Sequence, residues 1–300
     1  MQCVERGLIR LEDDVTALLP ELGKLPVLTG FDDKGKRILT KRTKTITLRS
    51  VSFFLYYYMI DLSIPRNLLT HTSGLAYDFD HPDLIRYRSL GYTEGNDGGN
   101  HVVDKASAPL VFEPGTSLSY GASLDWCGKL VERLTNQSLE EYMKSSIFTP
   151  LEITDITFWP SKRPELGSRM MGKATRTDSG RLVECDLPPF VVETTDSDTE
   201  ECFGGHGAYA SMPDFFKILQ SLLLDDEKLL KKSTAVELFR PQLTAEERNG
   251  MRAIQATPKG LTGYHEDVEL DWGLCGCLFL NDYMEIGRGS QRYSGEGFRI

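Results

Sequence analysis

The sequence predicts an α+β fold, in which the helices group in the middle of the chain and an antiparallel pair of strands comes late. The chain has 300 residues, 40% of them hydrophobic, which is enough for one generous core or two modest ones. Apolar residues recur at helical spacing through the middle of the chain, whereas runs typical of strands are few. Segregated helices and strands indicate α+β rather than a doubly wound sheet. We expect one domain over residues 1–300.

The composition excludes several classes of partner. Asp and Glu total 44 against 34 Lys and Arg, so the net charge is −10 at pH 7. This balance argues against a nucleic-acid surface and against docking on anionic lipid. The six cysteines are too few for a disulfide scaffold, and none is paired with histidine at zinc spacing. The first residues do not form a signal peptide, so we expect a cytoplasmic protein without a metal or a membrane partner.

The N-terminal part predicts short elements. Apolar residues between Met1 and Leu22 recur at roughly helical spacing and are interrupted by Gly7, which predicts two short helices. Nothing leads into the first of them, so we expect that a preceding segment is missing. In the charged loop over residues 31–44, Asp33 to Gly35 form a possible hairpin turn.

The stretch from Val51 to Ile60 is apolar or aromatic at every position except Ser52. It is shorter than the roughly 20 residues that a membrane span needs. The run shows neither strand alternation nor a helical stripe, although it resembles an aggregation-prone window. The run therefore fits neither a buried strand nor a buried helix well.

The middle of the chain contains several marked helices. Apolar residues from Leu124 to Leu134 form one stripe. Ser138 and Glu141 form a capping box that opens a helix through Ile147. A third helix follows the Ser211-Met-Pro-Asp cap, and residues 234–239 form a last short one.

Strands are expected near the end of the chain. Residues 172–187 predict a hairpin around the Asp-Ser-Gly sequence at 178–180. Residues 272–280 predict one buried strand, in which Cys275 and Cys277 are small buried residues rather than a redox or metal pair. Residues 283–293 are expected to return beside it.

Four clusters of polar and glycine residues are candidates for a functional site. They are Leu68–Tyr77 (LLTHTSGLAY), Phe112–Trp126 (FEPGTSLSYGASLDW), Phe203–Ser211 (FGGHGAYAS) and Tyr293–Gly295 (YSG). Each alone also has a structural explanation, because Ser and Thr cap turns and glycines permit sharp ones. The glycine-rich cluster is not followed by Lys-Ser/Thr, so a nucleotide site is not indicated.

Together and in this order, the four clusters resemble the serine β-lactamase and penicillin-binding-protein superfamily, in its branch of class C β-lactamase-like esterases and lovastatin-type fungal acyltransferases. The resemblance covers nearly the whole chain. It implies a β-lactamase/transpeptidase-like antiparallel sheet flanked by helices, together with a helical region. It also implies acyl transfer through a serine ester of a small ester, thioester or amide, with neither metal nor organic cofactor.

The resemblance also implies roles for individual residues. Tyr120 matches the tyrosine of the second motif, which acts as base and acid. Gly205 and His206 lie in the glycine-rich turn that borders the cleft, and Tyr77 is expected to line the acyl pocket. The third motif corresponds to Tyr293, Ser294 and Gly295.

The sequence departs from the family at its first motif, Ser-x-x-Lys. No serine of this chain has a lysine three positions on, and Ser63-Ile-Pro-Arg66 has the wrong cation and a proline that breaks a helix. Free tyrosine titrates near ~10, so Tyr120 needs a neighbouring cation to ionise near neutrality. In the family, residues 47–49 would lead almost directly into Leu68, so residues 50–65 have no counterpart, and we interpret them as an extra insertion, such as a retained intron read as protein. The chain also stops soon after the third motif. We therefore expect a chain truncated at both ends, with sheet strands missing at both termini and no activity as written.

Two alternatives remain open. One is a pseudoenzyme, a binding module that retains the cleft without the chemistry. The other is a metal-dependent hydrolase that uses His71, His101 or His206, although none of them has a paired spacing on one helix.

Overall fold

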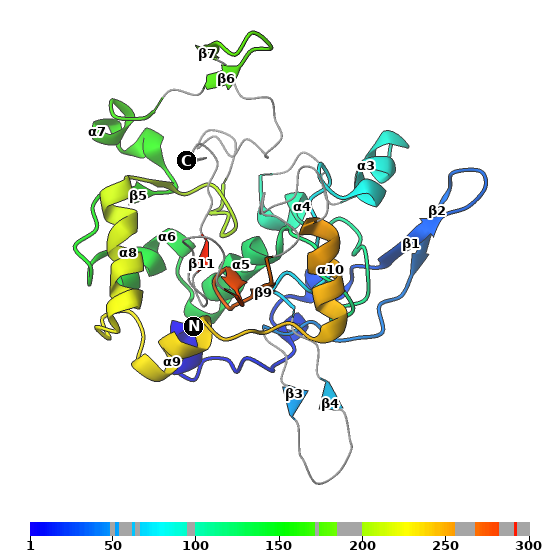
Figure 1. The fold of residues 1–300 in the computed structure, drawn as a ribbon, viewed down its shortest axis with the longest axis horizontal. Helices are drawn as coiled ribbons and strands as arrows, with labels where there is room; N and C mark the ends of the chain where they lie inside the picture. Colours follow the sequence, from blue (N-terminus) through cyan, green and yellow to red (C-terminus); the bar gives the residue numbers. More distant parts are fainter. Residues whose placement is uncertain are drawn as a thin grey trace.

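The computed structural model describes residues 1–48, 52–53, 62–63, 67–94, 100–171, 174–184, 200–255, 268–281 and 291–292. Helix α5 (Ser123–Thr135) lies at the centre of the molecule, with α6 (Leu139–Met143) and α8 (Met212–Leu224) to one side and α10 (Ala245–Gln255) to the other (Figure 1). The strands of the described part form four two-stranded sheets and one of three strands. Every strand pair is antiparallel. The α+β prediction is confirmed, with small separate sheets.

The N-terminal helices are shorter than the sequence predicts. They are α1 (Gln2–Glu5), a 3-10 turn at Val15–Ala17 and α2 (Pro20–Gly23). Gly7 adopts a φ of 69° and ends the first helical turn, as its position in the sequence indicates. The predicted turn at residues 33–35 joins β1 (Val27–Phe31) and β2 (Arg37–Thr40), a hairpin that projects from the body (Figure 1).

The stripe predicted over residues 124–134 is the buried face of α5. Trp126 and Leu130 are 0% and 2% exposed, and they pack in a core cluster with side chains of α1 and α2. The Trp126 Nε1–H donates to the carbonyl oxygen of Ala106 at 2.8 Å. The helix ends at Asn136, whose left-handed φ of 53° is the usual geometry of a C-cap.

The capping predictions are confirmed. Ser138 and Glu141 form the expected capping box at the start of α6, which continues as a π-helical turn over Lys144–Phe148. Ser211 caps α8 by accepting from the N–H of Asp214. The last predicted short helix is α9 (Lys232–Leu238).

Several helices were not predicted. Among them are α3 (Pro82–Ser89), α4 (Val102–Lys105), α7 (Pro164–Gly167) and α10, together with a 3-10 turn at Pro160–Lys162. Only Leu84 and Tyr87 of α3, and Glu247 and Met251 of α10, are buried. So few buried positions leave no strong apolar stripe in the sequence.

The prediction of one strand over residues 272–280 is wrong. The segment is a tight hairpin of β9 (Leu270–Trp272) and β10 (Cys277–Phe279), in which Trp272 pairs with Cys277. The N–H of Gly273 donates to the carbonyl oxygen of Gly276 at 2.8 Å and closes the turn. The expected return strand is present as β11 (Gln291–Arg292), which pairs with β10. Residues 282–290 lie outside the described part.

The other strands are short. The predicted hairpin over residues 172–187 is formed by β6 (Ala174–Arg176) and β7 (Leu182–Glu184). The pair of β5 (Ile156–Thr157) and β8 (Tyr209–Ala210) was not predicted.

The proposed insertion at 50–65 contains β3 (Ser52–Phe53), which pairs with β4 (Leu62–Ser63). The two chain segments that flank this insertion are hydrogen-bonded to each other, since the N–H of Leu68 donates to the carbonyl oxygen of Thr47 at 3.2 Å. The N–H of Thr47 in turn donates to Asn67 Oδ1 at 3.0 Å. This closure is compatible with an insertion, which stays a prediction.

Candidate active site

Tyr120 lies in the segment that leads into α5, and His71 holds this segment on both sides of the tyrosine. The N–H of Ser119 donates to the carbonyl oxygen of His71 at 3.0 Å, and the N–H of Gly121 donates to His71 Nδ1 at 3.4 Å. A Cβ at position 121 would lie 2.4 Å from the carbonyl oxygen of Leu75, so only glycine permits this close approach. The first two sequence motifs therefore form one interlocked unit.

Aromatic rings surround the half-buried Tyr120. Its ring centroid lies 4.6 Å from that of His71, 5.8 Å from Tyr77 and 6.3 Å from Trp272. The rings of His71 and Trp272 also meet edge to face at 5.1 Å. Such packing fixes the orientation of the phenol by contacts on several sides.

His71 is part of this structural framework. It is 2% exposed, and its backbone φ of 56° lies in the left-handed region. Burial lowers its pKa to about 3, so the imidazole is neutral near pH 7 and its Nδ1 serves as an acceptor. A metal-dependent hydrolase that uses His71 would need Nδ1 as a metal ligand, but here Nδ1 accepts the hydrogen bond from Gly121.

Ser73, in the same loop, is fully buried. Its Oγ is 2.8 Å from the Oγ of Ser123 and accepts from the N–H of Leu75 at 3.2 Å. This is the capping role that the sequence assigns to the loop.

The glycine-rich turn at 204–205 lies directly on the first turns of α5. A Cβ at Gly204 would come within 2.5 Å of the carbonyl oxygen of Leu124, and a Cβ at Gly205 within 2.9 Å of Asp125 Oδ2. The N–H of Gly205 donates to Asp125 Oδ1 at 2.8 Å. The two glycines are therefore required for a close approach of backbone to helix.

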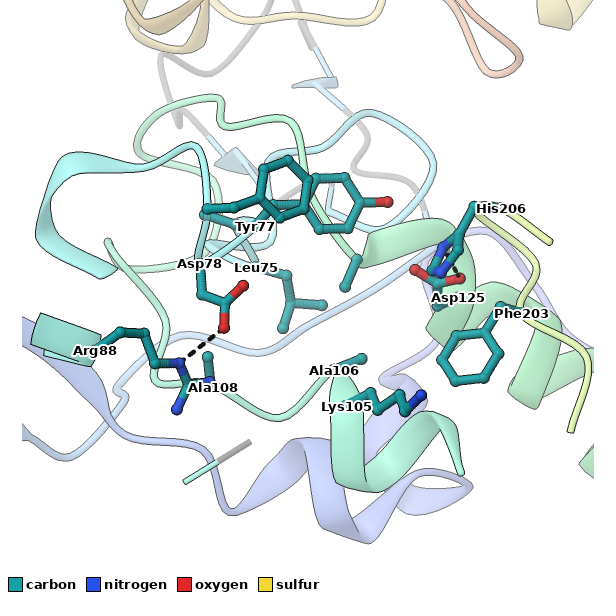
Figure 2. A pocket seen from close by; sticks show the side chains of 13 residues that line it. Leu75, Tyr77, Asp78, Arg88, Lys105, Ala106, Ala108, Asp125, Phe203 and His206 are labelled. Atoms are coloured by element: carbon teal, nitrogen blue, oxygen red, sulfur yellow. Dashed lines mark hydrogen bonds and ion pairs between the residues drawn. The ribbon is translucent and has the colours of Figure 1, made fainter. Parts of the chain in front are cut away.

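A cavity of about 30 Å³ opens beside this contact, which is room for roughly two waters or the head of a small ligand. Figure 2 shows Asp125 and His206 at one end, the Asp78–Arg88 ion pair at the other, and Tyr77 between them. The lining residues are Leu75, Ala76, Tyr77, Asp78, Phe79, Arg88, Lys105, Ala106, Ala108, Ala122, Asp125, Phe203 and His206.

Polar atoms in the cavity wall lack partners. Asp125 is 1% exposed, and its Oδ2 has no hydrogen bond within the described part of the chain. The ring nitrogens of His206 also have none there, although Nδ1 lies 3.3 Å from Asp125 Oδ1. The distance is that of an ion pair, but no hydrogen bond forms. At the other end Arg88 Nη2 is likewise buried without a partner.

The structure brings four of the predicted site residues into one region. Tyr77 connects them, because its ring lies 5.8 Å from that of Tyr120 and 6.5 Å from that of His206. Gly205 adjoins through its hydrogen bond to Asp125. The predicted residues Tyr293, Ser294 and Gly295 lie outside the described residues.

Sequence reasoning missed Asp125 and the positioning contact of His71. In the sequence, Asp125 stands out only as one residue of the second motif. The signal that could have identified it is a carboxylate between Leu124 and Trp126, at the start of an apolar stripe. His71 was weighed only as a turn residue or a metal ligand.

The part of the chain that the structure describes contains no group of three or more His, Cys, Asp or Glu placed to hold a metal. His101 contacts Glu200 and Glu201, at 3.4 Å and 3.3 Å. None of the helices in the described ranges combines the length and the apolar character that crossing a bilayer requires.

The helical body, the small antiparallel sheets and the tyrosine at the start of α5 define a β-lactamase/transpeptidase-like protein. The family model described as Beta-lactamase matches residues 65–276. The chain belongs to the Beta-lactamase family, in the branch of the fungal lovastatin-type acyltransferases.

Two curated relatives illustrate this branch. A monacolin J acid methylbutanoyltransferase of Aspergillus terreus is 40% identical over 244 residues, which are 81% of this chain and 54% of the relative. A lovastatin esterase of Penicillium rubens is 34% identical over 285 residues, 94% of this chain and 66% of the relative. The chain spans about half to two thirds of the length of the curated relatives it matches.

Solved structures agree with this assignment. Unliganded simvastatin synthase (LovD) from Aspergillus terreus superimposes with a TM-score of 0.80 at 35% identity, covering 97% of this chain and 67% of that one. EstCE1, a hydrolase with promiscuous acyltransferase activity, superimposes with a TM-score of 0.57 at 19% identity, and the match covers 92% of this chain and 64% of EstCE1. This match shows a similarity of fold alone.

Proposed function

We propose that this chain forms the acyl-transfer cleft of an acyltransferase or esterase that acts on small esters or thioesters, with Tyr120 as the residue that handles the proton. The observation that carries the proposal is the position of Tyr77, whose ring lies 5.8 Å from that of Tyr120 and 6.5 Å from that of His206, while Tyr77 and His206 line the cavity. Support also comes from the acyltransferase and esterase relatives. We keep Tyr293, Ser294 and Gly295 as candidate residues of the third motif, and a cytoplasmic location as a proposal.

The chemistry assigns Tyr120 two opposite steps. As an attacking hydroxyl adds to the ester carbonyl, its proton moves to the phenolate oxygen of Tyr120. The phenol then returns this proton to the departing alkoxide, so the tyrosine ends as it began. The tight aromatic packing around Tyr120 supports this role, because proton transfer depends on a fixed position.

These residues do not supply the nucleophile of the reaction. No serine among the 300 residues has a lysine three positions on. A tyrosine needs a neighbouring cation to ionise near neutrality, and the lysine of the Ser-x-x-Lys motif, which supplies that cation in the family, is absent from the sequence. We therefore propose that the chain by itself forms no acyl-enzyme and that its cleft works within a longer product.

The test compares the 300-residue chain with the product of the longest open reading frame that contains it. Each is treated with a fluorophosphonate serine probe and with p-nitrophenyl butyrate. We expect labelling and hydrolysis only in a longer product that encodes Ser-x-x-Lys, and a loss of roughly 10²- to 10⁴-fold in kcat for Tyr120→Phe. Covalent labelling of the chain alone, or full activity of Tyr120→Phe, would overturn the proposal.

A second candidate is a binding module that retains the cleft without turnover. It is favoured by a cavity whose wall contains Asp125 Oδ2, which has no hydrogen bond within the described residues, although the Ser-x-x-Lys motif is absent from the sequence. A transcript that encodes no such motif in frame supports this candidate.

A further inference from the structure

The cavity beside Tyr77 contains polar atoms that the fold leaves without partners. Asp125 Oδ2 and the two ring nitrogens of His206 are buried and form no hydrogen bond within the described residues. A buried polar atom without a hydrogen bond destabilises the fold, and a charged one does so more strongly. Asp125 is only 1% exposed, so the fold places an uncompensated carboxylate oxygen against this space. Such an arrangement indicates a site for a small polar group.

From these contacts we infer that the Asp125–His206 end of the cavity is a subsite for a neutral hydroxyl group carried on an apolar body. An ionised carboxylate only accepts hydrogen bonds, so the group at Asp125 Oδ2 must be a donor. An imidazole ring carries at least one N–H, which His206 donates to the same hydroxyl oxygen. One hydroxyl thus provides a partner for Asp125 Oδ2 and for one ring nitrogen of His206.

The charges of the lining favour a neutral group over an ammonium or a carboxylate. Asp78 and Arg88 form an ion pair at 2.7 Å, which neutralises the far end. Lys105 lies in the same wall, with Nζ 5.9 Å from the ring centroid of Phe203, and opposes the charge of Asp125. The charges of Asp78, Arg88, Lys105 and Asp125 therefore sum to zero, so the lining as a whole carries no excess charge of either sign.

The walls between the two ends accommodate an apolar body. Tyr77 stacks on Phe79 with centroids 5.0 Å apart, and Phe203 packs on His206 at 5.1 Å. Phe79 is 42% exposed, so this wall reaches the surface. A cavity of about 30 Å³ takes the hydroxyl head and leaves the rest of the ligand along the rings.

The subsite is one of recognition, because the ring of Tyr77 lies between His206 and Tyr120. A hydroxyl bound at Asp125 anchors the small molecule, and a different part of the same molecule faces Tyr120. This inference rests on the proposed function, since it names the group that the cleft recognises, but its test measures binding alone. Failure of the esterase assay leaves the binding result unaffected, and the reverse also holds.

The test is an NMR titration of the chain labelled with ¹⁵N-histidine, in which His206→Gln assigns the ring signals. The probes are 2-phenylethanol, its methyl ether and 2-phenylethylammonium. The ether retains the oxygen but lacks the O–H donor. We expect saturable shifts of the His206 ring nitrogens with the alcohol, and affinities about 10- to 100-fold weaker for the ether.

Asp125→Asn keeps the acceptor for Gly205 and replaces Oδ2 by an amide donor. We expect it to weaken binding of 2-phenylethanol by about 10- to 100-fold. Asp214→Asn is the matched control, because Asp214 is also buried and accepts from the backbone N–H groups of Thr154 and Asp155 but lies outside the cavity. It should bind as the unmodified chain does.

Several outcomes overturn the inference. They are equal affinity for the ether and the alcohol, tighter binding of the ammonium, unchanged binding by Asp125→Asn, and no saturable shift at the solubility limit of the alcohol. The last outcome would mean that water alone fills the space. If Asp125→Asn does not fold, as judged by its amide spectrum, the comparison of alcohol with ether on the unmodified chain decides.

Discussion

The two histidine loops that flank the tyrosines differ in how their polar atoms are used. In the loop over residues 67–77, His71 Nδ1 and the His71 carbonyl oxygen accept hydrogen bonds from the two neighbours of Tyr120. In the loop over residues 203–207, neither ring nitrogen of His206 forms a hydrogen bond with a described residue, and the ring lines a cavity. The same residue type in two glycine-containing loops therefore serves structure in one and recognition in the other. The atoms that each imidazole meets make the difference.

The largest expected effect is the difference in stability loss between replacing His71 and replacing His206 by alanine. His71→Ala removes the stacked ring and the acceptor for Gly121, and leaves alanine at a φ of 56°. We expect the free energy of unfolding to fall by about 3–5 kcal/mol. His206→Ala should lose only about 1 kcal/mol, because no hydrogen bond is broken. Urea denaturation followed by circular dichroism measures both, and equal losses would show that the two loops are not different.

Glycine substitutions sharpen the comparison at the backbone. A Cβ at Gly121 would lie 2.4 Å from the carbonyl oxygen of Leu75 and 2.5 Å from the Cα of Ala76, and neither atom can move alone. A Cβ at Gly205 would instead meet the side chain of Asp125, at 2.9 Å. We expect Gly121→Ala to cost about 3 kcal/mol and Gly205→Ala about 1 kcal/mol. Thermal unfolding of both variants tests this order, which a greater loss for Gly205→Ala would reverse.

The pH dependence of stability follows from the burial of His71. The folded pKa is about 3 against an ordinary value of 6.5, because burial disfavours the charged ring. Between these values the unfolded chain binds a proton that the folded chain does not, so stability falls as the pH falls. The expected slope is about 1.4 kcal/mol per pH unit below pH ~6.5, with no further change above it.

Two variants isolate this slope in urea titrations between about pH 5 and pH 7, above the range where carboxylates titrate. His71→Asn tolerates the left-handed backbone and should flatten the dependence. Burial also lowers the pKa of His81, so His81→Gln measures the contribution of that residue. An undiminished slope in His71→Asn contradicts the assignment.

The fold predictions were confirmed where the sequence signal involves residues that are close together in the chain. The capping box at Ser138 and the cap at Ser211 depend on residues a few positions apart, and both helices begin where predicted. The run over residues 272–280 misled because its turn, closed between Gly273 and Gly276, interrupts an otherwise apolar strand pattern. Helix α3 was missed because only Leu84 and Tyr87 are buried.

The site was predictable only in part for a related reason. The order of motifs predicts Tyr77, Tyr120, Gly205 and His206, and the structure brings them into one region. The contact of Asp125 with Gly205 spans 80 residues of sequence. The folded backbone decides which buried oxygen atom receives a hydrogen bond from a residue so far away in the sequence. The sequence contains no local pattern that predicts such a bond.

The smallest expected effect is the most discriminating one. His206→Leu replaces two unpartnered buried nitrogens by apolar atoms, so the unfolding free energy should stay within about 1 kcal/mol of the original or rise. His71→Leu removes an acceptor and leaves the N–H of Gly121 buried without a partner, so it should lose about 2–3 kcal/mol. Calorimetric unfolding of the two matched variants compares them directly. A large loss in His206→Leu would show that its nitrogens already stabilise the fold, which would assign this loop the structural role of the other.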